Sequence, residues 1–312
     1  MQDIVKEIQQ LKKERNAVIL AHNYQLPEVQ DVADFTGDSL ELSRTAASSK
    51  AGVVVFCGVY FMAETASVLC PDKVVLIPDA SAGCPMANMI TAKDLIELKK
   101  RNPKAMVVGY VNTTAEVKAE VDICCTSSNA VDVVLKLKDA DLLSGAGPLP
   151  GTGEIIFIPD KYLADYVSKK TGRRLISWDG YCPTHVKILP EDIIKQIRLH
   201  PKAKVMAHPE CTPEVIALAD AVVSTGKMCR LAKESQGKEF IVATEVGIIH
   251  RLKKENPEKK FYPASELAVC PNMKKITLEK VLWSLQDLKE VVKVPDEIRK
   301  RAIKAIDKML DI

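Results

Sequence analysis

Three cysteines in this chain are each followed by proline in the same local setting. Each Cys-Pro pair comes after an apolar, strand-like run, and an isoleucine stands at the same distance beyond each one. The three thiols are those of Cys84, Cys182 and Cys270. Three thiolates alone cannot supply the four ligands of a structural zinc site, but His185 could provide the fourth. They could instead hold an iron–sulfur cubane with one iron left open as a Lewis acid.

The remaining cysteines fit structural positions better. Cys57 lies in an apolar run typical of a buried strand, and Cys124 and Cys125 follow a similar segment. Cys70 ends a helix-like stretch and is also assigned a structural role, as expected for a reduced cysteine in a protein core. Cys211 and Cys229 have no counterparts in the other repeats, and they stay unassigned. The same structural reading is open for the three Cys-Pro thiols, but their shared proline and isoleucine favour a shared site.

Composition and charge narrow the class of protein. The chain has 312 residues, of which 47% are hydrophobic and 27% charged, as in ordinary globular proteins. A net charge of +3 over 44 basic and 41 acidic residues argues against nucleic acid or a membrane surface as partner and for a small molecule. The amino terminus lacks the layout of a signal peptide, and no apolar run reaches the length of a membrane span. These features predict a cytoplasmic protein.

A repeat organises the chain around three polar triplets. A helix-like segment, an apolar strand-like run and a triplet recur three times. The triplets are His22-Asn23-Tyr24, Tyr110-Val111-Asn112 and His208-Pro209-Glu210. Acidic and hydroxyl residues recur at fixed distances beyond them: Glu28, Glu116 and Glu214; Asp34, Asp122 and Asp220; Ser39, Ser127 and Thr225. The middle unit is longer than the others because of a Gly- and Pro-rich segment at 144–153, which suits a surface loop.

The alternation of strands and helices predicts an α/β fold. Near-continuous apolar strands such as Val53–Phe56 and Ile155–Ile158 favour parallel sheets covered on both faces by helices. We therefore expect three homologous three-layer domains around a pseudo-threefold axis. Their predicted ranges are 1–86, 87–184 and 185–272, followed by a helical segment at 273–312.

The triplets, hydroxyl residues and cysteines all follow predicted strands. Ligand sites in parallel sheets lie beyond the carboxyl ends of the strands, so the three sets are expected to converge. Ser39, Ser127 and Thr225 each precede a helix-like run, where they could be simple caps or could mark helix ends that receive a carboxylate or phosphate. The recurring glutamates and aspartates are assigned a structural role.

The chain resembles the quinolinate synthase family over essentially its whole length. The resemblance rests on His22-Asn23-Tyr24-Gln25, Gly37-Asp38-Ser39, Gly109-Tyr110-Val111-Asn112-Thr113, Cys124-Cys125-Thr126-Ser127-Ser128-Asn129-Ala130, Gly180-Tyr181-Cys182-Pro183-Thr184-His185, His208-Pro209-Glu210-Cys211, Ser224-Thr225-Gly226 and Val269-Cys270-Pro271-Asn272-Met273. It implies three α/β domains and a [4Fe–4S] cluster held by Cys84, Cys182 and Cys270, with one open iron.

The resemblance also implies an activity and its residues. The expected reaction condenses iminoaspartate with dihydroxyacetone phosphate to quinolinate in NAD biosynthesis, with functional coupling to L-aspartate oxidase or aspartate dehydrogenase. Proton transfer is expected from Tyr24, His185 and Glu210. Substrate binding is expected from His22, Ser39, Tyr110, Val111, Asn112, Ser127, His208, Pro209, Glu210 and Thr225.

Two other interpretations remain open at this stage. The first is a cluster-dependent hydro-lyase that acts on another small carboxylate. The second is a zinc-stapled scaffold or sensor that binds an anion without converting it. Identifying the metal in the purified protein would distinguish the zinc-stapled scaffold or sensor from the two iron–sulfur enzymes. A product assay would then distinguish quinolinate synthesis from the hydro-lyase reaction.

Overall fold

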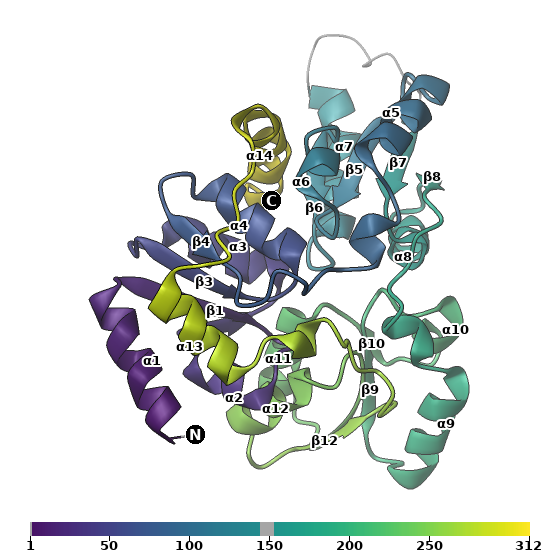
Figure 1. The fold of residues 1–312 in the computed structure, drawn as a ribbon. Helices are drawn as coiled ribbons and strands as arrows, with labels where there is room; N and C mark the ends of the chain where they lie inside the picture. The colour runs from purple at the N-terminus through teal and green to yellow at the C-terminus, as the bar shows by residue number, and fades with distance from the viewer. Residues whose placement is uncertain (1, 144–152) are drawn as a thin grey trace.

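A computed structural model describes residues 2–143 and 153–312 of the chain (Figure 1). The side chains of residues 138–143 are not described. The predicted surface loop at 144–153 therefore lies outside the described residues except for Gly153.

Three parallel four-stranded sheets form the framework, each with the same strand order. The first, in the order β2-β1-β3-β4, contains β1 (Ala17–His22), β2 (Phe35–Gly37), β3 (Val53–Cys57) and β4 (Val74–Leu76). The second, β6-β5-β7-β8, contains β5 (Met106–Tyr110), β6 (Ile123–Cys125), β7 (Ile155–Ile158) and β8 (Leu175–Ser177). The third, β10-β9-β11-β12, contains β9 (Lys204–Ala207), β10 (Ala221–Val222), β11 (Glu239–Ala243) and β12 (Lys260–Pro263).

Helices alternate with these strands, as the α/β prediction requires. The first repeat contains α1 (Gln2–Glu14), α2 (Pro27–Val32), α3 (Ser39–Ser48) and α4 (Tyr60–Leu69). The second contains η1 (Met86–Asn88), α5 (Ala92–Arg101), α6 (Ala115–Lys118), α7 (Ala130–Leu143) and α8 (Lys161–Thr171). The third contains η2 (His185–Lys187), α9 (Pro190–Leu199), α10 (Pro213–Ile216), α11 (Thr225–Glu234) and α12 (Ile248–Glu255). Each sheet falls within one predicted range, while the boundaries themselves stay a prediction.

The recurring aspartates hold equivalent backbone positions in the three repeats. The backbone N–H groups of Ile19, Val107 and Val205, in the central strands β1, β5 and β9, donate to Asp34, Asp122 and Asp220 at 2.7–2.8 Å. The recurring glutamates lie in the first turns of α2, α6 and α10, where an acidic side chain complements the helix dipole. Both sets have the structural role that the sequence suggested.

The three repeats meet at a shared polar contact. Asp38, of the first repeat, caps α3 by accepting hydrogen bonds from Leu40 and Glu41 backbone N–H groups. Its other carboxylate oxygen accepts from the Ser128 hydroxyl at 2.6 Å and from the Ser224 hydroxyl at 3.2 Å. One side chain from each repeat therefore lies at this junction, so the three repeats are in contact there. The three lobes around it are visible in Figure 1.

The carboxyl-terminal segment fastens the repeats from outside. It contains η3 (Met273–Lys275), α13 (Leu278–Asp287) and α14 (Asp296–Leu310). Helix α13 packs against α1, whereas α14 packs against β6 and α6. Arg44 of the first repeat and Asn129 of the second both donate to carbonyl groups at the end of α14. This helix therefore joins the first repeat to the second.

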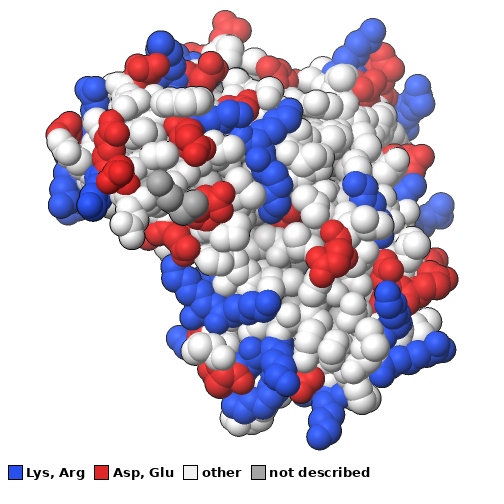
Figure 2. Space-filling view, turned by 60° about the horizontal axis from the view of Figure 1, so that its bottom comes forward, with Lys and Arg blue, Asp and Glu red and all other residues white. Residues whose placement is uncertain are grey.

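The surface carries no extended field of one sign on the face shown in Figure 2, where basic and acidic side chains are interspersed. This distribution agrees with the small net charge of the sequence. Within the part of the chain that the structure describes, no helix has the length and apolar character needed to cross a membrane.

Candidate metal centre and substrate cavity

A central cavity of about 160 Å³ lies where the three repeats meet. Loops after the strands of all three repeats line it, which is the position expected for a ligand site in parallel sheets. The sequence-predicted residues on its wall are His22, Tyr24, Ser39, Cys84, Tyr110, Asn112, Ser127, Cys182, His185, His208, Glu210, Thr225 and Cys270. The convergence expected from the repeat is therefore confirmed for these residues.

The three Cys-Pro loops have the same local structure. A short 3-10 helix, η1, η2 or η3, follows each cysteine. In each loop the backbone N–H groups two and three positions after the cysteine face the sulfur and act to lower the pKa of the thiol: those of Met86 and Ala87, Thr184 and His185, Asn272 and Met273. Amide hydrogen bonds to sulfur are one of the features that stabilise metal-bound thiolates and tune iron–sulfur centres.

These three thiols differ from the rest of the cysteines in exposure and share one space. Cys84, Cys182 and Cys270 are partly exposed, whereas the other cysteines are buried. The exposed part of Cys84 faces the cavity, whose walls surround the sulfur. This desolvation raises the pKa of Cys84 to about 12, and the nearby Cys270 adds to that rise. Cys84 in turn contributes to the raised pKa of Cys182. Three thiolates on the wall of one cavity would repel one another without a cation, so the donor set fits a thiophilic metal centre.

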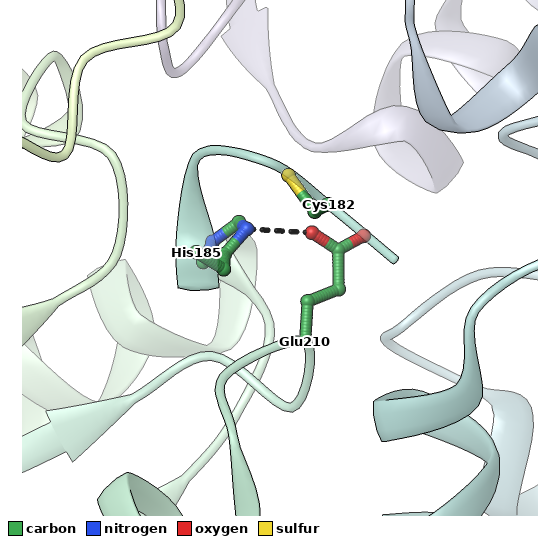
Figure 3. A group of neighbouring side chains, drawn as sticks. All are labelled: Cys182, His185 and Glu210. Atoms are coloured by element: carbon green, nitrogen blue, oxygen red, sulfur yellow. Dashed lines mark ion pairs between the residues drawn. The ribbon is translucent and has the colours of Figure 1, made fainter. Parts of the chain in front are cut away.

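Glu210 and His185 extend the metal-capable group beyond the thiols. Ligand atoms of Cys182, His185 and Glu210 lie within 4.8 Å of one another (Figure 3). His185 Nδ1 is 2.7 Å from Glu210 Oε2 but lacks the alignment of a hydrogen bond. Both side chains are almost fully buried. The imidazole and the carboxylate are therefore in close contact on the cavity wall.

Glu210 is a buried carboxylate with several polar neighbours. Tyr110 donates to its Oε1 at 2.6 Å, and Asn112 donates to the same oxygen at 3.4 Å. Burial alone would raise the pKa of Glu210, but the nearby imidazoles of His185 and His208 and the Tyr110 hydroxyl hold it below its usual value. Glu210 is therefore ionised and able to accept a proton.

His22 and His208 occupy equivalent positions and have the same tautomer. In each ring, Nδ1 accepts a hydrogen bond from the backbone N–H two residues later, that of Tyr24 or Glu210. Burial lowers the pKa of His22 to about 4 and that of His208 to about 3, so both rings are neutral near pH 7. A neutral ring whose Nδ1 is an acceptor carries its proton on Nε2. Each histidine thus offers one N–H donor.

The hydroxyl residues are not simple helix caps. Asp38 caps α3 and Ser224 caps α11, so Ser39 and Thr225 are the first residues inside these helices. The Thr225 hydroxyl instead accepts from Asn23 at 3.0 Å, and the Ser127 hydroxyl lies 3.2 Å from His208 Nε2. The capping interpretation is therefore wrong for Ser39 and Thr225, and both side chains line the cavity.

Two of the predicted binding residues are placed differently. Val111 is buried, and its backbone N–H donates to Cys125 at 2.9 Å. Pro209 lines a separate surface hollow beside α8. Neither residue is among those that line the cavity, so their contribution to substrate binding stays a prediction.

Sequence reasoning missed several residues at the site. Lys187 and Glu245 line the cavity, and Thr244 contacts the side chains of Tyr24 and His185. Thr244 and Glu245 directly follow β11, so the rule that located the triplets could also have found this pair. Lys187 gives no comparable signal, because it follows a cysteine loop and has no basic counterpart in the first repeat.

Comparison with known proteins agrees with this site. The family model described as Quinolinate synthetase A protein matches residues 6–311. A quinolinate synthase from Dehalococcoides mccartyi is 55% identical over 99% of this chain and 98% of its own length. Quinolinate synthase 1 from Methanosarcina acetivorans and the quinolinate synthase from Thermodesulfovibrio yellowstonii are each 52% identical with the same coverage.

The match spans all three repeats and both carboxyl-terminal helices, α13 and α14. Because the model covers nearly the whole chain and the relatives align from end to end, the likeness does not rest on one motif. It includes the three cysteine loops and the three triplets, which all lie within the matched residues. This chain belongs to the quinolinate synthetase A family.

Proposed function

We propose that this chain makes quinolinate by condensing iminoaspartate with dihydroxyacetone phosphate, releasing phosphate and two waters. The names of its relatives support the product, and the cavity supports the chemistry. The observation that carries the proposal is the convergence of three equivalent thiols with neutral imidazole donors and an ionised carboxylate in one cavity. Such a set suits a reaction of small anions that needs both a Lewis acid and proton transfer.

Cys84, Cys182 and Cys270 would hold a [4Fe–4S] cluster. With three thiolate ligands the bound cluster would have one iron without a protein ligand and would supply Lewis-acid chemistry to the cavity. The equivalent amide donors at each sulfur support this assignment.

Binding of the dicarboxylate and the phosphate is assigned to the neutral donors. His22 and His208 offer Nε2–H groups, while Ser39 and Thr225 stand at the first positions of α3 and α11. The positive ends of helices attract carboxylate and phosphate. Because Asp38 and Ser224 already accept from N–H groups at these two helix starts, the donors assigned there are the Ser39 and Thr225 hydroxyls. Lys187 adds a cationic side chain to the cavity wall.

Proton transfer is assigned to Glu210, His185 and Tyr24. Ring formation requires removal of protons from carbon and delivery of protons to leaving oxygens. Glu210 is assigned as the proton acceptor because it is the ionised carboxylate beside His185, although the same neighbours lower its pKa and make it a weaker base than an ordinary glutamate. Burial raises the pKa of Tyr24 well above its usual value, so its hydroxyl keeps a proton to donate. His185 lies between them, 2.7 Å from Glu210 and 3.4 Å from Tyr24.

The substrates also define the partners of the reaction. Iminoaspartate is an imine that water hydrolyses, so an enzyme that oxidises aspartate must form it close in time to its use. Coupling to L-aspartate oxidase or aspartate dehydrogenase is part of this proposal.

The test is anaerobic production of the chain, followed by metal analysis and a product assay. We expect about four irons per chain and formation of quinolinate from dihydroxyacetone phosphate and freshly generated iminoaspartate, detected by chromatography. The metal-free protein is the matched control and should form none. A protein that binds only zinc would support the scaffold or sensor. Iron without quinolinate, but with dehydration of another carboxylate, would support the hydro-lyase.

A further inference from the structure

The first polar triplet has a polar middle residue, whereas the other two triplets have apolar ones. The three middle residues are Asn23, Val111 and Pro209. Asn23 is fully buried and is not among the residues that line the cavity. The repeat therefore does not require an amide at this position, and its side chain is not placed to contact substrate. Because a buried amide must find hydrogen-bond partners, the partners of Asn23 indicate its role.

Asn23 lies between a residue of the cavity wall and a residue outside it. Its Nδ2 donates to the Thr225 hydroxyl oxygen at 3.0 Å, and its Oδ1 accepts from Arg251 Nη1 at 2.9 Å. Thr225 is the first residue of α11 and lines the cavity, whereas Arg251 belongs to α12 and is not a lining residue. One amide of the first repeat thus connects two helices of the third.

The chemistry of arginine fixes the direction of these hydrogen bonds. A guanidinium group only donates, so the Asn23 atom that faces Arg251 must be the oxygen. The amide nitrogen then faces Thr225, where it can only donate, and the Thr225 oxygen is the acceptor. The hydroxyl group keeps its own proton for a different partner. Because Thr225 lines the cavity, a bound anion can accept that proton.

Neighbouring groups hold Arg251 and Asn23 in place. Arg251 Nε donates to Glu255 Oε1 at 2.7 Å, one turn later in α12. The Gln30 side-chain nitrogen lies 3.2 Å from the backbone carbonyl of Asn23 and 2.9 Å from that of Gly247, directly before α12. Helix α12 also packs against α2 and α11. The guanidinium group and the amide are therefore fixed relative to each other by contacts from both repeats.

We propose that Arg251 is a positioning residue for the substrate anion. It fixes the amide of Asn23, and Asn23 in turn makes Thr225 a hydrogen-bond donor to a carboxylate or phosphate in the cavity. Without Arg251 the amide could turn over and accept from Thr225, which would direct the hydroxyl proton away from the anion. This inference rests on the proposed function for the identity of that anion, while the binding of simple anions can be measured without turnover.

The variant Asn23→Asp separates this role from a mere contact between repeats. The carboxylate has nearly the same shape and pairs with Arg251 at least as strongly, so a structural link would be kept. Its second oxygen can only accept, so the Thr225 hydroxyl must donate to it and not to the anion. We expect succinate, inorganic phosphate or both to bind about 10- to 100-fold more weakly than to the parent, the value of one hydrogen bond to a charged group.

Isothermal titration calorimetry of the iron-replete protein measures both probes. Succinate has the four-carbon dicarboxylate of iminoaspartate without its reactive imine, and inorganic phosphate represents the phosphate group of the second substrate. Parental affinity for both probes in Asn23→Asp would overturn the inference.

The charge that Asn23→Asp adds is controlled in a second background. A negative charge beside the cavity would repel an anion whether or not Thr225 has a hydroxyl group. In Thr225→Val we expect Asn23→Asp to weaken probe binding by less than about a further threefold, because the hydroxyl that it redirects is absent. An equal loss in both backgrounds would show repulsion alone and would refute the proposed role of the hydroxyl.

Arg251 is tested by the loss and the return of one donor. Arg251→Met removes the guanidinium group, Arg251→Lys keeps one N–H donor, and Lys253→Met, at an exposed position of the same helix, is the matched control. We expect Arg251→Met to weaken probe binding about tenfold and Arg251→Lys to stay within about twofold of the parent. Lys253→Met should match the parent. If Asn23→Asp does not fold, this series decides the inference, and equal affinities in all four proteins would contradict it.

Turnover gives an independent measurement. In Arg251→Met, KM for the substrate whose anion meets Thr225 should rise about tenfold while kcat changes less than about threefold, because the lost interaction is one of binding. If the parent binds a probe but makes no quinolinate, the proposed reaction fails, yet the binding series still decides this inference. A parent that binds neither probe and makes no quinolinate would overturn both.

Discussion

The cysteine loops and the polar triplets contribute to the same cavity, but the three repeats have preserved them to different degrees. Every cysteine loop has the same proline, the same 3-10 turn and the same pair of amide donors to sulfur. The triplets share their position, and the first and third share a leading histidine, but their third residues all differ: Tyr24, Asn112 and Glu210. A cluster with three similar corners benefits from equal ligands, whereas an asymmetric substrate needs different groups around it.

The largest expected loss of activity comes from removing one of the three equivalent cysteine ligands. Replacement of Cys84, Cys182 or Cys270 by serine should remove bound iron and lower kcat more than about 100-fold, beyond the range seen for groups that only support a ligand. Because the loops are alike, the three variants should agree within about threefold. Iron content and quinolinate formation measure both points.

Cys229→Ala is the control for the loss of a thiol. Cys229 is buried away from the cavity lining, so this variant should keep iron and activity. If one of the three serine variants kept its iron and most of its activity, that cysteine would not be a required metal ligand, despite the similar structure of the three loops.

The next largest loss of activity is expected in the polar triplets, whose third residues differ. Glu210→Gln should keep iron but lower kcat about 10²- to 10⁴-fold, because the amide keeps the shape of the side chain and cannot accept the proton. Asn112→Ala, at the equivalent position of the second triplet, should cost only about tenfold, the value of one hydrogen bond. Steady-state kinetics on iron-replete protein compare the two; equal losses would show that the triplets share one role.

Local sequence patterns were sufficient to predict most of the fold. Apolar runs located β1, β5 and β9, and the fixed spacing of Asp34, Asp122 and Asp220 revealed the repeat that the structure shows as equivalent hydrogen bonds. The cysteines and triplets could also be placed, because residues after parallel strands meet at one edge of the sheets.

Contacts between repeats could not be predicted in the same way. Thr244 contacts Tyr24 and His185, which are distant in the sequence, and no periodic pattern joins the three. Ser39 and Thr225 looked like caps because a hydroxyl before a helical run usually is one. The preceding residues, Asp38 and Ser224, took that role, and helix starts cannot be fixed to one residue from sequence alone.

The smallest expected effect concerns the histidines that two triplets share. His22 has a pKa of about 4 in the folded protein and 6.5 as its ordinary value. Between these values the unfolded chain binds more protons, so stability is complete above pH 6.5 and falls as the pH drops toward 4. This one group should remove about 2 kcal/mol of unfolding free energy between pH 7 and pH 5.

His22→Asn should remove that part of the pH dependence, since the asparagine oxygen can still accept from the Tyr24 backbone N–H and does not titrate. Denaturant unfolding of the metal-free protein at pH 7 and pH 5 measures the difference, with His200→Asn, outside the cavity lining, as the control. A variant as sensitive to acid as the parent would mean that His22 already accepts a proton when folded. Its Nε2–H would then not be a neutral donor, and the likeness between the first and third triplets would be one of position alone.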